Sequence, residues 1–226
     1  SVRDSAALLD ATIGADPGAP YFAPPLREGF TAAMHRRPGP LRVALCDTTL
    51  TGAALHPACR TAVQDAAKLL ASMGHHVEPA RPEADTLGMM EAWTKIVACG
   101  TAAAIRRTLA LKGRDLQQGD IEGVSRGALR YAASISGADY VDALAKIHAY
   151  GRELATFFDG FDVLLTPTLA EPPAKIGRFN HTTEDYVQYR MGPDGIFAYS
   201  PFTAAFNASG QPAMSVPLGM SPEGLP

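Results

Sequence analysis

Residues 41–79 read LRVALCDTTLTGAALHPACRTAVQDAAKLLASMGHHVEP, and this stretch decides the fold class. The apolar run at residues 41–46 is typical of a short buried strand. Pro57 suits the first position of a helix, and Gly74 suits the position just past its end. The helix between them carries one apolar stripe, made of Cys59, Val63, Ala66, Leu70 and Met73. We expect residues 76–79 to form a second strand, parallel to the first because a crossover helix joins them.

The segments before this unit predict a helix and a loop. Residues 4–14 have helical spacing and stop at Gly14. Residues 15–40 are rich in proline and glycine, which remove hydrogen-bond donors and favour turns. We therefore predict a long surface loop over residues 15–40.

The segments after it predict further helices and one more strand. Helical apolar patterns cover residues 83–111, 128–135 and 140–158. Residues 162–166 are typical of a buried strand, which Pro167 ends. Residues 200–219 favour a small-residue helix, a glycine turn and a short strand between prolines. Together these patterns predict an α/β fold with a mixed, mostly parallel sheet covered by helices.

The composition excludes several classes of partner. The 226 residues are 46% hydrophobic and carry 20 basic and 23 acidic side chains, a net charge of -3. This balance offers no basic surface for nucleic acid or an anionic membrane, and no apolar run is long enough to span a bilayer. Cys46, Cys59 and Cys99 include no C-x-x-C pair, which fits a reducing compartment. We expect a cytoplasmic protein.

The two ends predict a piece of a longer chain. Ser1 is followed at once by a helical pattern, and residues 221–226 form a turn-rich stretch that normally leads into another strand. We expect residues 1–226 to be the carboxyl-side part of a single α/β domain whose sheet is incomplete at both ends.

One short motif offers a nucleophile, but its context is unfavourable. Residues 123–127 read GVSRG and match the G-x-S-x-G nucleophile elbow, in which a strand delivers the serine to a sharp turn. The residues before it are too polar for the central strand of a hydrolase sheet. We interpret the match as chance, and an α/β-hydrolase that uses Ser125 remains an alternative.

Other candidate residues point to a pocket and not to a metal or cofactor. The six histidines show no ligand spacing, and the chain has no glycine-rich phosphate loop. Trp93 and Cys99 lie on a helix that is apolar almost all round, so either side chain can face the core or a pocket. The residues by themselves therefore predict no catalytic group, no metal site and no cofactor.

The last block of the chain resembles the carboxyl-terminal motif of the amidase signature family. It reads FNASGQPAMSVPLG over residues 206–219. Residues 161–168, FDVLLTPT, look like that family's strand and proline turn, and residues 1–10, SVRDSAALLD, are similar to the helix that follows its signature core. The resemblance covers essentially the whole chain, in the family's order. The spacing of the motifs and the alanine-rich sequence look closest to those of bacterial amidases of the cyclic-amide and nylon-oligomer hydrolase type.

The resemblance implies a reaction whose catalytic residues are not in this chain. Family members use a serine nucleophile, a second serine in a cis peptide and a lysine, and they form an acyl-enzyme. These groups precede the helix that begins this chain, and no Gly-Gly-Ser-Ser stretch occurs in it. The resemblance therefore implies that this chain has no catalytic residue, supplies pocket wall and is inactive by itself. Its nominated substrate-binding residues are Trp93, Cys99, Ser200 and Phe202.

One departure from the family pattern narrows the substrate class. In the family's glutamine-amidotransferase branch, an aspartate seven residues before the motif's asparagine holds the amino-acid substrate. Ser200 is the matching residue here. Without that carboxylate a free ammonium group has no partner, so the resemblance implies a neutral small-molecule amide.

The expected partners are therefore a small-molecule amide and the missing amino-terminal part of the same protein, with a homodimer as a candidate assembly. Two alternatives remain open: a noncatalytic α/β binding module, and the α/β-hydrolase that uses Ser125.

Overall fold

The computed structural model describes residues 1–21 and 24–226. The chain divides into two compact units, Ser1–Leu41 and Arg42–Pro226, and each is described by itself. The prediction that residues 1–226 belong to a single domain stays a prediction.

The first unit contains two helices, one of which the sequence patterns missed. α1 (Val2–Thr12) begins with a capping box between Ser1 and Asp4. α2 (Phe30–Ala33) lies inside residues 15–40, so the prediction of a loop throughout that range is wrong. The cause is a contact distant in sequence. The Asp10 carboxylate accepts hydrogen bonds from the backbone N–H groups of Phe30, at 2.6 Å, and Thr31, at 2.9 Å.

These two bonds satisfy the first free amides of α2. The Thr31 side chain, followed by the backbone N–H groups of Thr31 and Phe30, lowers the pKa of Asp10. Residues 28–34 also contain no proline, so the backbone is free to turn there. Residues 22 and 23 of the predicted loop lie outside the described residues.

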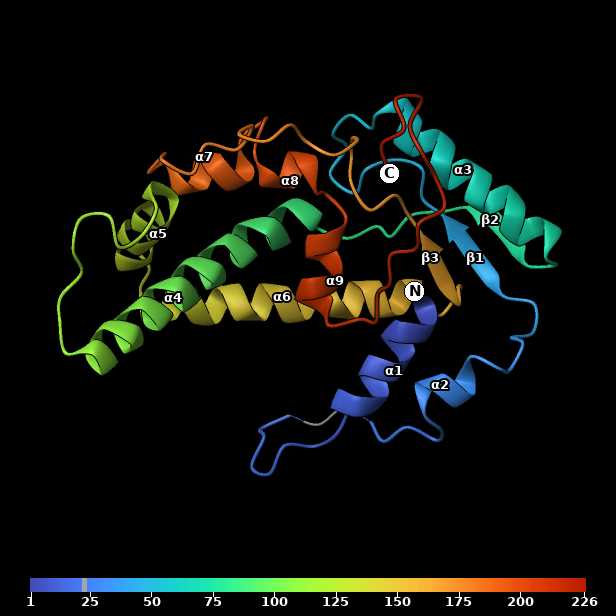
Figure 1. Ribbon diagram of the computed structural model, residues 1–226, viewed down its shortest axis with the longest axis horizontal. Helices are drawn as coiled ribbons and strands as arrows, with labels where there is room; N and C mark the ends of the chain where they lie inside the picture. The colour runs from blue at the N-terminus through green and yellow to red at the C-terminus, as the bar shows by residue number, and fades with distance from the viewer. Residues whose placement is uncertain (22–23) are drawn as a thin grey trace. The chain divides into compact units, whose positions relative to one another are not determined.

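The second unit is built on a parallel sheet. β1 (Arg42–Leu45) lies in the centre, β2 (His76–Pro79) pairs with it on one side and β3 (Val163–Leu165) on the other. Both pairings are parallel. α3 (Pro57–Ser72) connects β1 to β2 and contacts both strands (Figure 1). The predicted α/β class, with a mostly parallel sheet and covering helices, is confirmed.

An ion pair between Arg42 and Asp162 connects β1 to the residue just before β3. The Asp162 carboxylate accepts a hydrogen bond from the Arg42 backbone N–H at 2.8 Å and another from the Arg42 guanidinium at 2.9 Å. These bonds lower the pKa of Asp162. They fix the register in which the short β3 meets the central strand.

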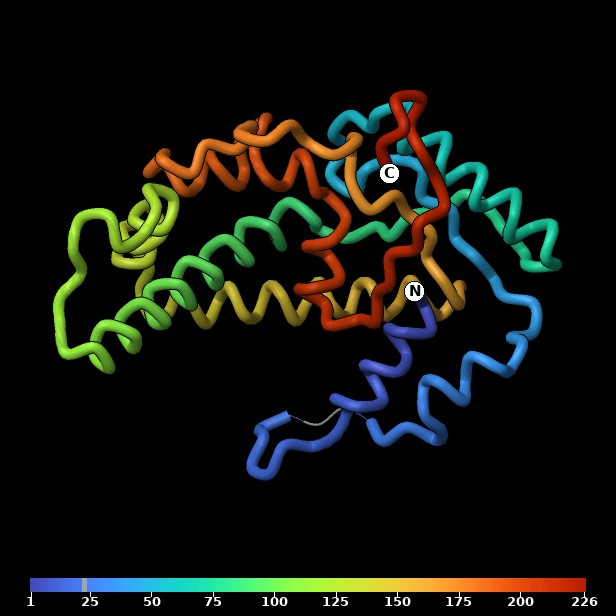
Figure 2. Tube along the Cα trace, in the orientation of Figure 1, coloured from blue at the N-terminus to red at the C-terminus, as the bar shows by residue number. Residues whose placement is uncertain are grey.

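Several helices of the second unit pack together and share one hydrophobic core. α4 (Thr86–Lys112) and α6 (Gly137–Phe157) lie side by side, α5 (Gly123–Ala133) contacts α4, and α9 (Thr203–Ser209) crosses both α4 and α6 (Figures 1 and 2). The core between them contains Met89, Met90, Ala143, Ile147, Tyr150, Leu154, Ala204 and Ala205.

Two short helices between β3 and α9 were not predicted. They are α7 (Tyr186–Met191) and α8 (Ile196–Tyr199). Asp185 caps α7, because its carboxylate accepts a hydrogen bond from the Gln188 N–H at 3.0 Å. Helices of six and four residues are too short to show the apolar repeat from which helices are predicted.

The predicted strand between Pro212 and Pro217 is wrong. Residues 211–220 form no strand, and most of them are exposed. The two prolines lack N–H donors, and none of the described strands pairs with this segment. The Ser215 hydroxyl lies 3.1 Å from the hydroxyl of Thr168, just past β3. Figure 2 shows the segment as the red tube that runs from α9 toward the strands.

Two glycines of α5 allow this helix to pack closely against residues 182–184, which precede α7. A Cβ atom on Gly123 would collide with the backbone carbonyl oxygen of Thr182, and one on Gly127 with that of Glu184. The Glu184 carboxylate also pairs with two arginines of α5. The close approach therefore requires glycine at both positions.

The loop from α4 to α5 is closed by an ion pair. Arg114 donates hydrogen bonds to the Asp120 carboxylate at 2.6 and 3.0 Å, and the Gln117 N–H donates a third at 2.9 Å. The Arg114 bonds, followed by the Gln117 bond, lower the pKa of Asp120 to about 2.

We predict that Gly127→Ala destabilises the fold. The added methyl group meets backbone and not a flexible side chain, so the free energy of unfolding should fall by roughly 1–3 kcal/mol, measured by urea unfolding followed by circular dichroism. The matched control is Gly100→Ala in α4, where no atom lies within 4 Å of the added Cβ. That change should raise stability by about 0.5–1 kcal/mol through helix propensity. Equal effects of the two substitutions would contradict the close approach of α5.

We also predict an unusually acidic carboxyl group at Asp120. Its pKa in the folded chain, about 2, lies below the ordinary value of 3.8. Its contribution to stability is therefore present above the ordinary pKa and is lost as the pH falls toward the folded value. A carbon-detected NMR titration should give a midpoint of about 2, and Arg114→Gln should move that midpoint up toward 3.8. A midpoint that Arg114→Gln does not move would show that the ion pair is absent in solution.

Candidate functional site

The four nominated substrate-binding residues all lie in the helical layer of the second unit. Trp93 and Cys99 are on α4, Ser200 follows α8, and Phe202 is the residue before α9. α4 is a single helix of 27 residues, so its orientation sets the positions of both Trp93 and Cys99.

Trp93 lies at the edge of the main core. It is half-buried and packs against the core cluster that α4, α6 and α9 share. Its neighbour Thr94 is 1% exposed, and the Thr94 hydroxyl donates a hydrogen bond to the Met90 carbonyl at 2.8 Å. The indole therefore combines a packed side with an accessible side, as a pocket wall requires.

Cys99 faces a different set of side chains. It lies six positions after Trp93, which on an α-helix places the two side chains on different faces. Cys99 is half-buried and lies near Tyr131 of α5 and Tyr186 of α7. Burial raises the pKa of both tyrosines.

Ser200 and Phe202 lie at the turn between α8 and α9. The Ser200 hydroxyl is half-buried and lies 2.7 Å from the Thr203 hydroxyl, and either oxygen can be the donor. Phe202 is 1% exposed, so its ring packs inside the second unit and has almost no free surface. The substrate-binding role of these two residues, like that of Trp93 and Cys99, stays a prediction.

The structure does not support the nucleophile elbow at Ser125. Residues 123–127 lie within α5, and the residues before Glu122 form turns and no strand. Both glycines of the motif instead allow the close approach of α5 to residues 182–184. The strand–turn–helix arrangement that would expose a serine nucleophile is thus missing at Ser125.

A half-buried cation that the sequence patterns did not indicate lies between α4, α7 and α8. Arg190 is in the last turn of α7, and its Nε donates a hydrogen bond to the Thr94 hydroxyl at 3.3 Å. Its guanidinium carbon lies 4.7 Å from the centre of the Phe197 ring and 5.6 Å from that of Tyr186. Burial lowers the pKa of Arg190, although arginine remains charged at any physiological pH.

Arg190 has no acidic partner within residues 1–21 and 24–226. The ion pairs found there involve other arginines, namely Arg36, Arg42, Arg60, Arg114, Arg126, Arg130 and Arg178. The hydroxyl of Tyr186 is buried and has no hydrogen-bond partner among the same residues. A half-buried charge without a counterion and a buried hydroxyl without a partner are both unfavourable, so the two groups are candidates for binding a ligand. A lone arginine in a segment without periodicity gives no such signal in the sequence.

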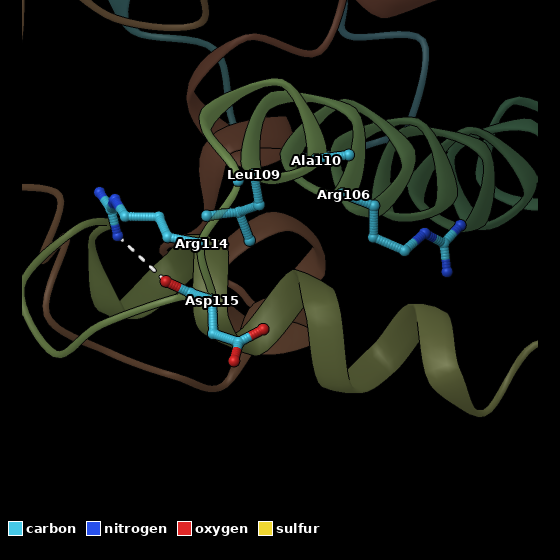
Figure 3. A pocket seen from close by; sticks show the side chains of 6 residues that line it. Arg106, Leu109, Ala110, Arg114 and Asp115 are labelled. Carbon is cyan, nitrogen blue, oxygen red and sulfur yellow. Dashed lines mark hydrogen bonds between the residues drawn. The ribbon is translucent and has the colours of Figure 1, made fainter.

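Two surface depressions lie near the ends of α4 and α5. Arg106, Leu109, Ala110, Gly113, Arg114 and Asp115 line the first one. In Figure 3 the side chains of Arg106 and Arg114 point away from each other, and Arg114 donates a hydrogen bond to the Asp115 carbonyl at 3.0 Å. The second depression lies between α5 and α7 and includes Tyr131 and Tyr186. The polar side chains of the second depression include Arg130 and Glu184, which pair with each other. None of the four nominated residues lines either depression.

Two further kinds of feature are absent from the described residues. No group of three or more His, Cys, Asp or Glu side chains there could hold a metal ion. None of their helices is long and apolar enough to cross a membrane.

Known proteins resemble this chain along its whole length. The 6-aminohexanoate-cyclic-dimer hydrolase of Paenarthrobacter ureafaciens is 32% identical over 231 residues, which cover 100% of this chain and 47% of that protein. The putative amidase AmiA2 of Mycobacterium tuberculosis is 30% identical over 245 residues, which cover 100% of this chain and 44% of that protein. The chain thus spans about half the length of the curated relatives it matches.

Solved structures show the same relationship. A structure of 6-aminohexanoate cyclic dimer hydrolase superposes with a TM-score of 0.89 at 32% identity, over 100% of this chain and 48% of the other. A bacterial aryl acylamidase of the amidase signature enzymes superposes with a TM-score of 0.81 at 24% identity, over 100% of this chain and 46% of the other, which shows the fold alone. The family described as Amidase matches residues 1–226. The parallel sheet, its helical layer and this match over the whole sequence place the chain in the amidase family.

Proposed function

We propose that this chain is part of a serine amidohydrolase that cleaves the carbon–nitrogen bond of a neutral small-molecule amide. The observation that carries the proposal is the family match over every residue of the chain. The names of its relatives agree, because the hydrolases of Paenarthrobacter ureafaciens and Pseudomonas sp. act on a cyclic dimer of 6-aminohexanoate.

The proposed reaction proceeds through an acyl-enzyme. A serine attacks the amide carbon, and its proton passes through a second serine, held in a cis peptide, toward a lysine. The amine leaves with a proton, and water then releases the acid from the acyl-serine. Backbone N–H groups stabilise the negative charge that develops on the carbonyl oxygen.

In this proposal the chain supplies the wall of the pocket and not the chemistry. The sequence has no Gly-Gly-Ser-Ser stretch, and in this proposal the catalytic groups precede its first helix. The part of the protein that carries them is the proposed partner of this chain. Trp93 and Cys99 on α4, with Ser200 and Phe202 before α9, form the wall that selects the substrate.

A neutral amide is the proposed substrate class because Ser200 has no charge to offer an ammonium group. Its hydroxyl is already within 2.7 Å of the Thr203 hydroxyl. A half-buried site of this kind disfavours a charged group that finds no counterion. We further propose that the protein acts in the cytoplasm, with a homodimer as its candidate assembly.

We predict that a fluorophosphonate probe labels the complete gene product at a serine outside residues 1–226. The reason is that only an activated serine reacts with such a probe, and Ser125 lies in a helix. Peptide mapping by mass spectrometry identifies the labelled serine, with Ser125→Ala as the control that should keep full labelling. Labelling of Ser125 itself would favour the α/β-hydrolase alternative. An unlabelled protein that binds amides without hydrolysing them would favour the noncatalytic binding module.

We predict that Ser200→Asp shifts substrate preference in the complete gene product. A carboxylate at this half-buried position should raise KM for a neutral amide by about tenfold and improve the relative kcat/KM for an amide that carries an ammonium group. The control is Ser5→Asp, an exposed residue of the first unit, which should leave both values unchanged. If Ser200→Asp and Ser5→Asp give the same kinetics, Ser200 does not line the pocket.

A further inference from the structure

The guanidinium of Arg190 is a charged group that the fold has partly removed from water without pairing it. Its Nε is bonded to the neutral hydroxyl of Thr94, and aromatic rings lie over it. No hydrogen bond from its terminal nitrogens to any residue in 1–21 or 24–226 was found. Those nitrogens are not among the fully buried atoms without a partner, so they keep some exposed surface. They are therefore available to an anion.

Arg178 is a second arginine that lies over two aromatic rings, and it provides a comparison for Arg190. Its guanidinium carbon lies 5.3 Å from the Phe179 ring centre and 5.4 Å from that of Tyr199, close to the values for Arg190. Unlike Arg190, it pairs with a carboxylate, that of Glu171, at 2.6 Å. The difference between the two arginines is the missing anion and not the aromatic setting.

The surroundings of Arg190 fit a carboxylate better than other anions. The planar guanidinium presents its N–H groups in a fork that matches two carboxylate oxygens. The Tyr186 hydroxyl is buried and has no hydrogen-bond partner among the described residues, and the centre of its ring lies 5.6 Å from the Arg190 guanidinium carbon, so it is a second donor near this cation. Two aromatic rings and a single positive charge provide an apolar setting for a singly charged acid, whereas a phosphate would bring more charge than one arginine balances.

The position of Arg190 connects it to the proposed pocket wall. Thr94, which accepts its hydrogen bond, is next to Trp93 in sequence. Phe197, which stacks on it, lies on α8 three residues before Ser200. The cation therefore lies between the two segments that carry nominated substrate-binding residues.

We propose that Arg190 and Tyr186 form a binding site for the carboxylate of a small organic acid, namely the acid released when a neutral amide is hydrolysed. This inference rests on the proposed function. A neutral amide has no negative charge for Arg190 to pair with, whereas hydrolysis creates one negative charge on the acyl side. The site would thus favour the product over the substrate, and product acid should inhibit the enzyme.

The test is a calorimetric titration of the complete gene product with hexanoate at neutral pH. Arg190→Gln should raise the Kd of hexanoate at least tenfold, because the charge-assisted hydrogen bonds are lost. Arg178→Gln, the matched control, should leave it within about twofold, because that arginine is already paired. Absence of hexanoate binding by the unsubstituted protein would overturn the proposal. An equal rise in the Kd of hexanoate in Arg190→Gln and Arg178→Gln would also overturn it. Such a result would show that removal of any arginine of this kind, or a general loss of structure, weakens binding.

A second variant keeps the test independent of folding. Arg190→Lys retains the charge but not the planar fork, so it should weaken hexanoate binding several-fold. Thermal unfolding should show Arg190→Gln to be no less stable than the unsubstituted protein, because it removes a half-buried charge that has no acidic partner among the described residues. If Arg190→Gln does not fold, Arg190→Lys decides the question, and an unchanged Kd for hexanoate would overturn the proposal.

Kinetics then identify the source of the carboxylate. If the site takes the released acid, Arg190→Gln should raise the inhibition constant of hexanoate at least tenfold, and by a larger factor than it lowers kcat/KM for hexanamide. If the carboxylate belongs to a substrate, kcat/KM should fall at least tenfold for adipamate and not for hexanamide, which supports the site but not its assignment to product. If neither of these two changes occurs, the proposal is overturned. Because the titration needs no turnover, an enzyme inactive on every amide would refute the proposed function and leave the carboxylate site to be decided by binding.

Discussion

The packing of α4 against α6 is the constraint on which the rest of the second unit depends. Met89 and Met90 of α4 meet Ile147, Tyr150 and Leu154 of α6 in a core that is almost fully closed to solvent. Truncating such a side chain, as in Leu→Ala, costs roughly 2–5 kcal/mol, a large part of the 5–15 kcal/mol that typically stabilises a domain. α4 therefore has one fixed orientation.

This fixed orientation determines what each face of α4 presents to its neighbours. One face carries Trp93 at the edge of the main core, and another carries Cys99 beside the tyrosines of α5 and α7. Thr94 meets Arg190 between them. The proposed pocket wall and the proposed carboxylate site are thus two consequences of how one helix is held, and the short helices α7 and α8 bring the cation to it.

Sequence reasoning found those parts of the fold that local patterns encode. The strand at Arg42–Leu45, the proline-started α3 and the parallel β2 follow from apolar runs and punctuation by proline and glycine. It missed α2, which depends on the Asp10 carboxylate twenty residues away in sequence, and it placed a strand after Pro212 where no partner strand lies. It could not find Arg190, because an unpaired charge becomes visible only when its neighbours are known.

We propose that this chain forms the wall of an amide-hydrolysing pocket whose nucleophile lies elsewhere in the protein. The decisive experiment is a crystal structure of the complete gene product trapped as an acyl-enzyme with a hexanoyl group. We expect an ester bond to a serine outside residues 1–226, with the acyl chain in contact with Trp93 of α4. An acyl group that touches no residue of this chain, or one attached to Ser125, would contradict it.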